Sequence, residues 1–163
     1  MTKKLEEALN VQIAAELWSA NLYLSMSFYF KREGLDGAAH WLKIQSNEEK
    51  EHACKMADFM LTRGGIPKLD KIDVVPQDWE SPLKAFEGVY EHERNITKFI
   101  SELLAQAKEE KDYLTEDFFW QFIREQAEEE ATAHDILEKL RKHGDTSLFF
   151  IDAELGKRST KEK

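Results

Sequence analysis

The chain has 163 residues, of which 42% are hydrophobic and 34% are charged, with seven glycines, three prolines and one cysteine. This length favours a single domain, and the shortage of Gly and Pro favours long solvated helices over a sandwich or barrel. One cysteine excludes a disulfide framework within the chain and a Cys-rich zinc or iron–sulfur site. The formal charge of −9 offers no basic surface to nucleic acid.

The first residues carry two lysines and then turn acidic, without the apolar core of a signal peptide. The most apolar stretch, 22–30, is about nine residues long, whereas a membrane span needs roughly twenty. We therefore expect no membrane association and, most simply, a cytoplasmic protein.

Breaker residues divide the chain into helical segments. Gly34 and Gly64 end the first two segments, and Ser81 followed by Pro82 predicts an N-cap and the start of the third. We expect a charged, frayed tail over 156–163. The predicted helices span residues 5–33, 37–63, 82–111, 116–143 and 147–155.

The lengths of the connections predict the topology. Tight turns make the first and second helices antiparallel, and likewise the third and fourth. The connection over 66–80 can cross the whole bundle at roughly 3.3 Å per residue, so the second and third helices run parallel. The expected fold is all-α, a single domain over 1–163, in which a four-helix bundle with one long crossover carries a short fifth helix.

Each long helix has an apolar stripe of residues spaced three and four apart, the face that meets its neighbours. Glu16 and Glu49 lie 18 and 15 residues from Gly34, about 27 and 22 Å along their helices. Acids also lie near the middle of the third and fourth stripes, nearly level with each other. We therefore expect His52 and four carboxylates to meet at mid-bundle: Glu16, Glu49, Glu93 and Glu129.

These acids require positive charge. Burying one unpaired carboxylate costs several kcal/mol, and four would exceed the stability of about 5–15 kcal/mol of a domain. No stripe carries a lysine or arginine at that height. Glu49 and His52 are three residues apart, so both reach one cation, and oxygen ligands with one imidazole suit iron or manganese, and also zinc. Two cations sharing a bridging carboxylate would balance the acids best.

Several motifs together resemble the ferritin superfamily, and specifically the bacterial non-haem ferritins. Tyr23 follows Glu16 by seven residues, and His92 precedes Glu93. The further motifs are Glu48-Glu49-Lys50-Glu51-His52, Glu125-Gln126-Ala127-Glu128-Glu129 and Phe149-Phe150-Ile151-Asp152-Ala153-Glu154-Leu155. The resemblance covers nearly the whole chain.

The resemblance implies a ligand set. In that family Glu16, Glu49 and His52 would hold the first iron, Glu49 would bridge, and Glu93 with Glu129 would hold the second. Gln126 and Tyr23 would support the site, Tyr23 as an electron donor. Three neighbouring acids would form a third iron position with Glu129, or else belong to a solvated acidic face: Glu48, Glu125 and Glu128.

The resemblance also implies the function: an iron store with ferroxidase activity, without haem. Fe(II) would be oxidised by O2 or H2O2, and ferric oxide-hydroxide would be deposited inside a hollow homo-oligomer of 24 subunits with octahedral symmetry. Each subunit would bind two irons, or three if the additional position is used.

Two departures from relatives qualify this prediction. Haem-containing bacterioferritins carry Met where this chain has Lys50. They and rubrerythrins place Glu-x-x-His on the fourth helix, where this chain has Gln126 and Glu129. An acid in place of an imidazole predicts a weaker second site that passes iron onward.

Two other functions remain open at this stage. One is a non-storage di-iron carboxylate enzyme, such as a peroxide-scavenging rubrerythrin-like protein. The other is a non-catalytic helical scaffold whose acids are structural.

Overall fold

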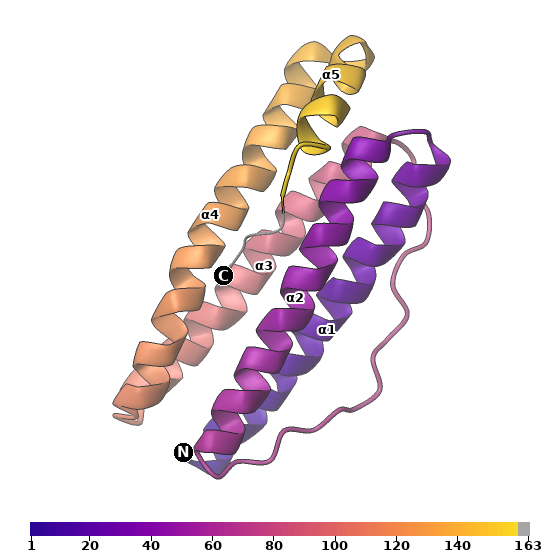
Figure 1. The fold of residues 1–163 in the computed structure, drawn as a ribbon. Coiled ribbons are helices and arrows are strands. Elements are labelled where there is room, and N and C mark those ends of the chain that lie inside the picture. Colours follow the sequence, from indigo (N-terminus) through magenta and orange to yellow (C-terminus); the bar gives the residue numbers. More distant parts are fainter. Residues whose placement is uncertain (160–163) are drawn as a thin grey trace.

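The computed structural model describes residues 1–159, except for the side chains of His143, Asp145 and Thr146. Within that part of the chain all regular structure is helical, which confirms the predicted fold class (Figure 1). The bounds agree with the predicted ones to within three residues. The helices are α1 (Lys3–Arg32), α2 (Asp36–Thr62), α3 (Pro82–Glu109), α4 (Tyr113–His143) and α5 (Asp145–Leu155).

Side-chain caps explain where the long helices begin. The hydroxyl of Thr2 accepts a hydrogen bond from the first turn of α1, and that of Ser81 does so for α3, as predicted. α4 begins three residues before its predicted start. The carboxylate of Asp112 accepts from the main-chain N–H of Thr115 at 3.2 Å and also pairs with Arg63, so the turn predicted over 112–115 is instead a capped helix start.

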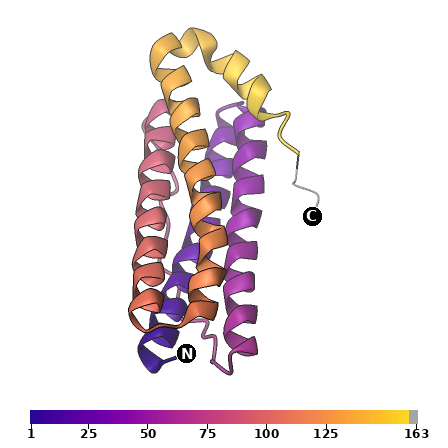
Figure 2. The same ribbon diagram turned by 90° about the vertical axis from the view of Figure 1, so that its left-hand side faces the viewer.

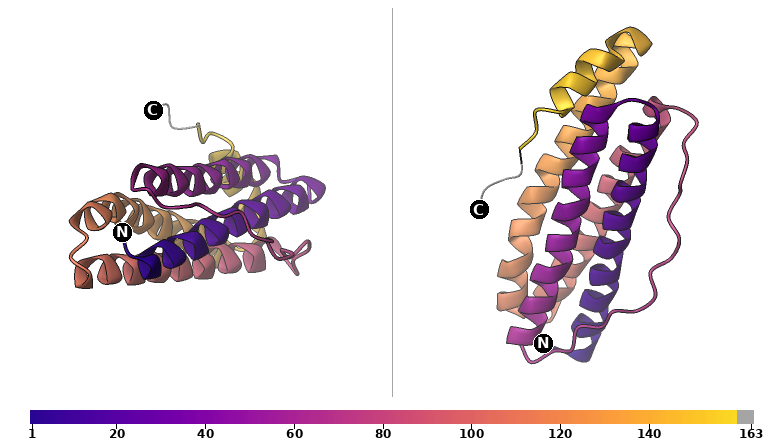
Figure 3. Two further views of the ribbon diagram at one scale, coloured as in Figure 1. Left: turned by 90° about the horizontal axis from the view of Figure 1, so that it is seen from below. Right: turned by 45° about the vertical axis from the view of Figure 1, so that its right-hand side comes forward.

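The crossover between α2 and α3 lies along the outside of α1 (Figure 3). Four hydrogen bonds attach it there: the side chains of Asn10, Ser25 and Arg32 donate to residues of the connection, and the main-chain N–H of Lys68 donates to the side chain of Asn10. It therefore joins opposite ends of the bundle, and α2 and α3 run parallel, as predicted from its length. No helix within the described residues combines the length and apolar character that crossing a membrane would require.

Two apolar clusters fill the bundle, one towards each end. The first contains residues such as Phe30 and Phe86, and the second contains residues such as Leu9 and Phe122. Between them lies a buried polar layer, to which each of the four long helices contributes. The two clusters each bring the four helices together, so the polar layer is fixed from both sides. The buried members of this layer are Gln12, Glu16, Ser19, Gln45, Ser46, Glu49, His52, Glu93 and Gln126.

The short helix α5 crosses the end of the bundle from α4 to α2 (Figure 2). It begins directly after Gly144, two residues before its predicted start. The φ of 56° at Gly144 lets the chain reverse without a longer loop. The first turn of α2 has no side-chain cap of its own. Instead Asp152 of α5 accepts the main-chain N–H of Ala38 at 2.7 Å, which satisfies an otherwise unpaired donor and places negative charge at a helix N-terminus.

Gly37 makes this docking possible. A Cβ at that position would lie 1.7 Å from the carbonyl oxygen of Asp152 and 2.9 Å from the main-chain nitrogen of Gly156. The segment after α5 contacts α2 through hydrogen bonds of Arg158 with His40 and Gln45. The prediction of a frayed tail is therefore wrong for 156–159, because backbone hydrogen bonds and contacts with α2 hold this segment; residues 160–163 lie outside the described part of the chain.

We expect Gly37→Ala to displace α5 and to destabilise the protein by about 1–3 kcal/mol, because the added methyl group overlaps the backbone of α5. The matched control is Gly88→Ala within α3, where the nearest atom to a new Cβ is 3.9 Å away and a gain of about 0.5–1 kcal/mol is expected. The midpoints of thermal unfolding, determined at one protein concentration, measure the change in stability of both variants. Equal midpoints for the two variants would contradict the docking.

Candidate metal centre

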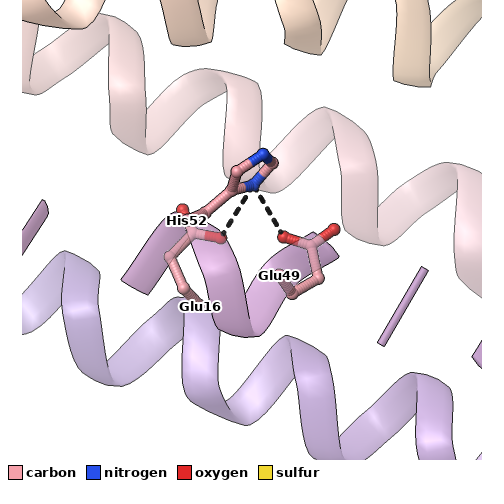
Figure 4. Close-up of side chains that lie close together, drawn as sticks. All are labelled: Glu16, Glu49 and His52. Carbon is pink, nitrogen blue, oxygen red and sulfur yellow. Dashed lines mark ion pairs between the residues drawn. The ribbon is translucent and has the colours of Figure 1, made fainter. Parts of the chain in front are cut away.

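Three side chains of the polar layer converge in the middle of the bundle (Figure 4). Glu16 comes from α1, whereas Glu49 and His52 come from α2, one helical turn apart. One potential ligand atom of each lies within 4.8 Å of those of the other two. Nδ1 of His52 lies 3.4 Å from Glu49 and 4.0 Å from Glu16. All three residues are buried, so the space between them suits a desolvated cation.

Two glutamines orient these acids. Gln12 lies one turn before Glu16 and donates to it at 2.7 Å. Gln45 lies one turn before Glu49 and donates to it at 3.3 Å, and also to Glu129 of α4 at 3.0 Å. Each glutamine amide binds one oxygen of a buried carboxylate, and the other oxygen of that carboxylate faces the centre. The acids are thus held in place by neutral donors.

The second half of the centre is built around Glu93 of α3, which is 2% exposed. The hydroxyl of Tyr23 donates to one oxygen of Glu93. The side-chain amide of Gln126 donates to the other at 2.5 Å, and to the main-chain carbonyl of Glu93 at 3.2 Å. Glu129 is half-buried beside this group and repels the charge on Glu93. Tyr23, Gln126, Glu93 and Glu129 therefore lie together, as the sequence predicts.

The centre contains more acids than cationic groups. Within residues 1–159, no lysine or arginine forms an ion pair with Glu16, Glu49 or Glu93, and His52 is the group that pairs with the first two. One oxygen of Glu16 has no hydrogen-bond partner in this part of the chain. An unsatisfied buried carboxylate oxygen is costly. The geometry and the donor set fit one or more multivalent cations.

Comparison with known proteins identifies the family of the chain. The profile of the ferritin-like domain matches residues 6–143. The chain belongs to the ferritin family. A bacterial non-heme ferritin of Bacteroides fragilis is 57% identical over 158 residues, 97% of this chain and 99% of the relative. One from Campylobacter jejuni is 37% identical over 155 residues, 93% of this chain and 92% of the relative.

Solved structures give the same result. The crystal structure of an open pore ferritin from the archaeon Archaeoglobus fulgidus is 50% identical and superposes with a TM-score of 0.95, covering 98% of this chain and 99% of the other. A humanized archaeal ferritin, also 50% identical, superposes with a TM-score of 0.96 over 98% of this chain and 99% of the other. The predicted resemblance to bacterial non-haem ferritins is therefore confirmed.

The acids predicted for a third iron position in this ferritin chain have separate surroundings. Glu48 pairs with Arg158, and Glu125 lies 3.4 Å from Nε2 of His52. Glu128 is exposed to solvent. Within the described residues, the group of three potential ligands whose ligand atoms lie within 4.8 Å of one another consists of Glu16, Glu49 and His52. A third position thus remains a prediction, and it would require these acids to move.

Burial changes the proton affinities of the acids in this ferritin. It raises the pKa of Glu16 and of Glu49, and repulsion from a neighbouring carboxylate adds to the effect in each. The pKa of Glu93 rises to about 7, because desolvation and repulsion from Glu129 outweigh the hydrogen bonds from Tyr23 and Gln126. Without metal, these carboxylates therefore hold protons at pH values where exposed carboxylates have lost them.

His52 shows the opposite balance of forces. Burial lowers its pKa, but hydrogen bonds with Glu125 and Glu49 and the charges of Glu49 and Glu16 raise it to about 10. The neighbouring carboxylates therefore favour the imidazolium form of His52 in the metal-free site. That cation partly compensates the acids, and it must lose a proton before the ring binds a metal.

Several residues of the site were not identified from the sequence as functional. Gln12 and Gln45 had a usable signal, since each precedes a site acid by four residues on the same stripe. Ser19 had no such signal, and His92 had only its place before Glu93: Nε2 of His92 lies 2.7 Å from the Ser19 hydroxyl, and its ring packs against Tyr23 and Trp18. That contact depends on how α1 and α3 face each other.

We expect metal binding to release protons. Zn(II), a redox-inert probe, must displace protons from His52 and from acids such as Glu93, so its affinity rises with pH, by about tenfold per pH unit for each proton released. Calorimetric titration at about pH 6 and 7, in buffers of different ionisation enthalpy, measures the Zn(II) affinity and the number of protons released. An affinity independent of pH would contradict the protonation states given above.

Proposed function

We propose that this chain is the subunit of an iron-storing ferritin that oxidises Fe(II) at its mid-bundle centre. The observation that carries the proposal is the buried cluster of Glu16, Glu49 and His52 beside Glu93, with no lysine or arginine paired to these acids within residues 1–159. Membership of the ferritin family supports iron as the cation. Iron here is the substrate and the cargo rather than a resident cofactor.

The proposed ligands divide between two irons. Glu16, Glu49 and His52 would hold the first, consistent with ligand atoms within 4.8 Å of one another. Glu93 and Glu129 would hold the second, with Glu49 bridging. Glu49 suits a bridge because it lies close enough to both Glu16 and Glu93 for its charge to interact with each of them.

The residues around the irons would favour oxidation. O2 or H2O2 takes one electron from each of two Fe(II) ions, and carboxylates stabilise the higher charge of the Fe(III) product. Tyr23 donates a hydrogen bond to Glu93, so it fixes this ligand. As an electron donor, its phenol would supply the oxidant with one electron beyond the two from the irons and pass its proton to Glu93. The second iron has no imidazole ligand in this assignment. It is therefore held more weakly and passes onward to hydrolyse and mineralise.

A hollow homo-oligomer would receive the mineral. We propose 24 subunits with octahedral symmetry, in the cytoplasm. Large apolar side chains exposed on the single chain support association, including Val11, Phe28, Phe149 and Phe150, which are 65–80% exposed. Elution at about twenty-four times the chain mass with an iron-rich core would fit storage, whereas a dimer would fit a non-storage di-iron enzyme.

We expect the double variant Glu49→Ala/His52→Ala to lose fast iron oxidation, with the rate falling about 100-fold or more. Its assembly should remain intact, because the double change removes one buried acid together with the imidazole that pairs with it. Absorbance of ferric species after air is added to Fe(II)-loaded protein gives the rate, and size-exclusion chromatography gives the assembly. The control is Glu51→Ala, an exposed acid of the same helix. Oxidation at the unmodified rate would exclude this site.

Glu129→Ala tests how the ligands are divided. We expect it to weaken the second Fe(II) about tenfold or more while leaving the first largely unchanged, since Glu129 is assigned to the second iron alone. Titration with Fe(II) under nitrogen resolves the binding of the first iron from that of the second. A larger effect on the first iron would mean that the assignment of ligands is wrong.

A further inference from the structure

An apolar groove opens between the N-terminal half of α1 and the C-terminal half of α3. Its volume is about 320 Å³. The apolar side chains that line it are Phe99 and Leu103 from α3, and Ala8, Val11 and Ala15 from α1. Leu103 is buried, whereas Phe99 and Val11 lie at the exposed mouth. We refer to this cavity as the α1–α3 groove.

The inner side of the α1–α3 groove reaches the proposed iron centre through one side chain. Gln12 lines the groove, although the residue is only 2% exposed. Its Nε2 donates to an oxygen of Glu16 at 2.7 Å, and Glu16 is a proposed ligand of the first iron. The Gln12 amide therefore separates the groove from the buried centre, and rotation about its side-chain bonds would join the two.

Two alanines leave space around the Gln12 side chain. Ala8 lies four residues before Gln12 and Ala15 lies three residues after it, so all three share one face of α1. Ala15 is also the residue directly before Glu16. A larger side chain at Ala15 would therefore fill the part of the groove that lies nearest the centre.

The lining of the α1–α3 groove favours an apolar ligand. Apart from Gln12, the polar side chains in it are those of Glu102 and Gln106. A hydrated Fe(II) ion would exchange its hydration shell for a single exposed carboxylate, that of Glu102. H2O2 would exchange hydrogen bonds with water for contacts with hydrocarbon. O2 carries no charge and donates no hydrogen bond, so its transfer from water to an apolar surface is favourable.

We propose that the α1–α3 groove is the entry site for O2, which passes Gln12 to reach the iron centre beside Glu16. This inference rests on the proposed ferroxidase function and specifies its oxidant, because O2 rather than H2O2 uses this route. The groove collects the apolar reactant on one side of Gln12, and the acids bind the metal on the other side. Each reactant thus meets surroundings that match its polarity.

Xenon tests the groove without any oxidation step. It is an apolar gas that binds in apolar cavities, and its anomalous scattering locates it in crystals of the intact assembly. We expect a xenon atom between Ala15 and Leu103 in the unmodified protein, and none in Ala15→Leu, where the added side chain fills the space. The absence of xenon from the groove of the unmodified protein, or a groove filled by a side chain of another subunit, would overturn the inference.

Oxidation kinetics test the route. We expect Ala15→Leu to lower kcat/KM for O2 about fivefold or more while kcat at saturating O2 stays the same, because only access has changed. Oxidation of Fe(II) by H2O2 under nitrogen should keep the unmodified rate in this variant. The matched control is Ala105→Leu, which adds the same side chain at an exposed position of α3 outside the groove and should change none of these rates.

Ala8→Leu fills the groove further from Glu16 and serves as the test if Ala15→Leu does not assemble, with the same selective loss of reaction with O2 expected. Unchanged rates in a variant that excludes xenon would overturn the entry route and leave the ferroxidase function intact. An equal loss of rate with O2 and with H2O2 would overturn the selective entry of O2. Failure of the unmodified protein to oxidise Fe(II) with either oxidant would instead overturn the proposed function, and the inference with it.

Discussion

Concentrated negative charge in the interior is the constraint on which the rest of this structure depends. Glu16, Glu49 and Glu93 are almost fully buried, at a cost that a small domain tolerates only with compensation. The fold compensates in two ways. Amide and hydroxyl donors satisfy individual oxygens, and proton uptake by His52 and the acids reduces the net charge. Apolar clusters on both sides then supply the packing that the polar layer lacks.

The C-terminal helix α5 and the residues that follow it stabilise α2. The first turn of this helix takes its cap from Asp152 of α5, and its middle is contacted by Arg158, so several contacts between residues more than 100 apart in the sequence meet on one helix. That helix also carries Glu49 and His52. The C-terminal segments therefore act on the centre through α2, although none of their residues belongs to the group of potential ligands within the described chain.

Much of this organisation could be predicted from the sequence. Helix periodicity, breaker residues and the long crossover determine the bundle, and the level spacing of Glu16 and Glu49 along their helices brings them together. The contacts of Arg158 could not be predicted, because they join residues about 110 apart and have no periodic pattern. The start of α4 differs for a local reason: the sequence around Asp112 predicts a turn, whereas the carboxylate of Asp112 caps the helix.

The separation of the two apolar clusters has a consequence for repeated use of the protein. Phe30 and Phe86 on one side and Leu9 and Phe122 on the other belong to clusters of apolar side chains, although Phe122 also contacts the ring of His52. The scaffold therefore does not depend on its cargo for cohesion. Such a subunit can load and unload its metal through many cycles while its architecture stays the same, as a durable container requires.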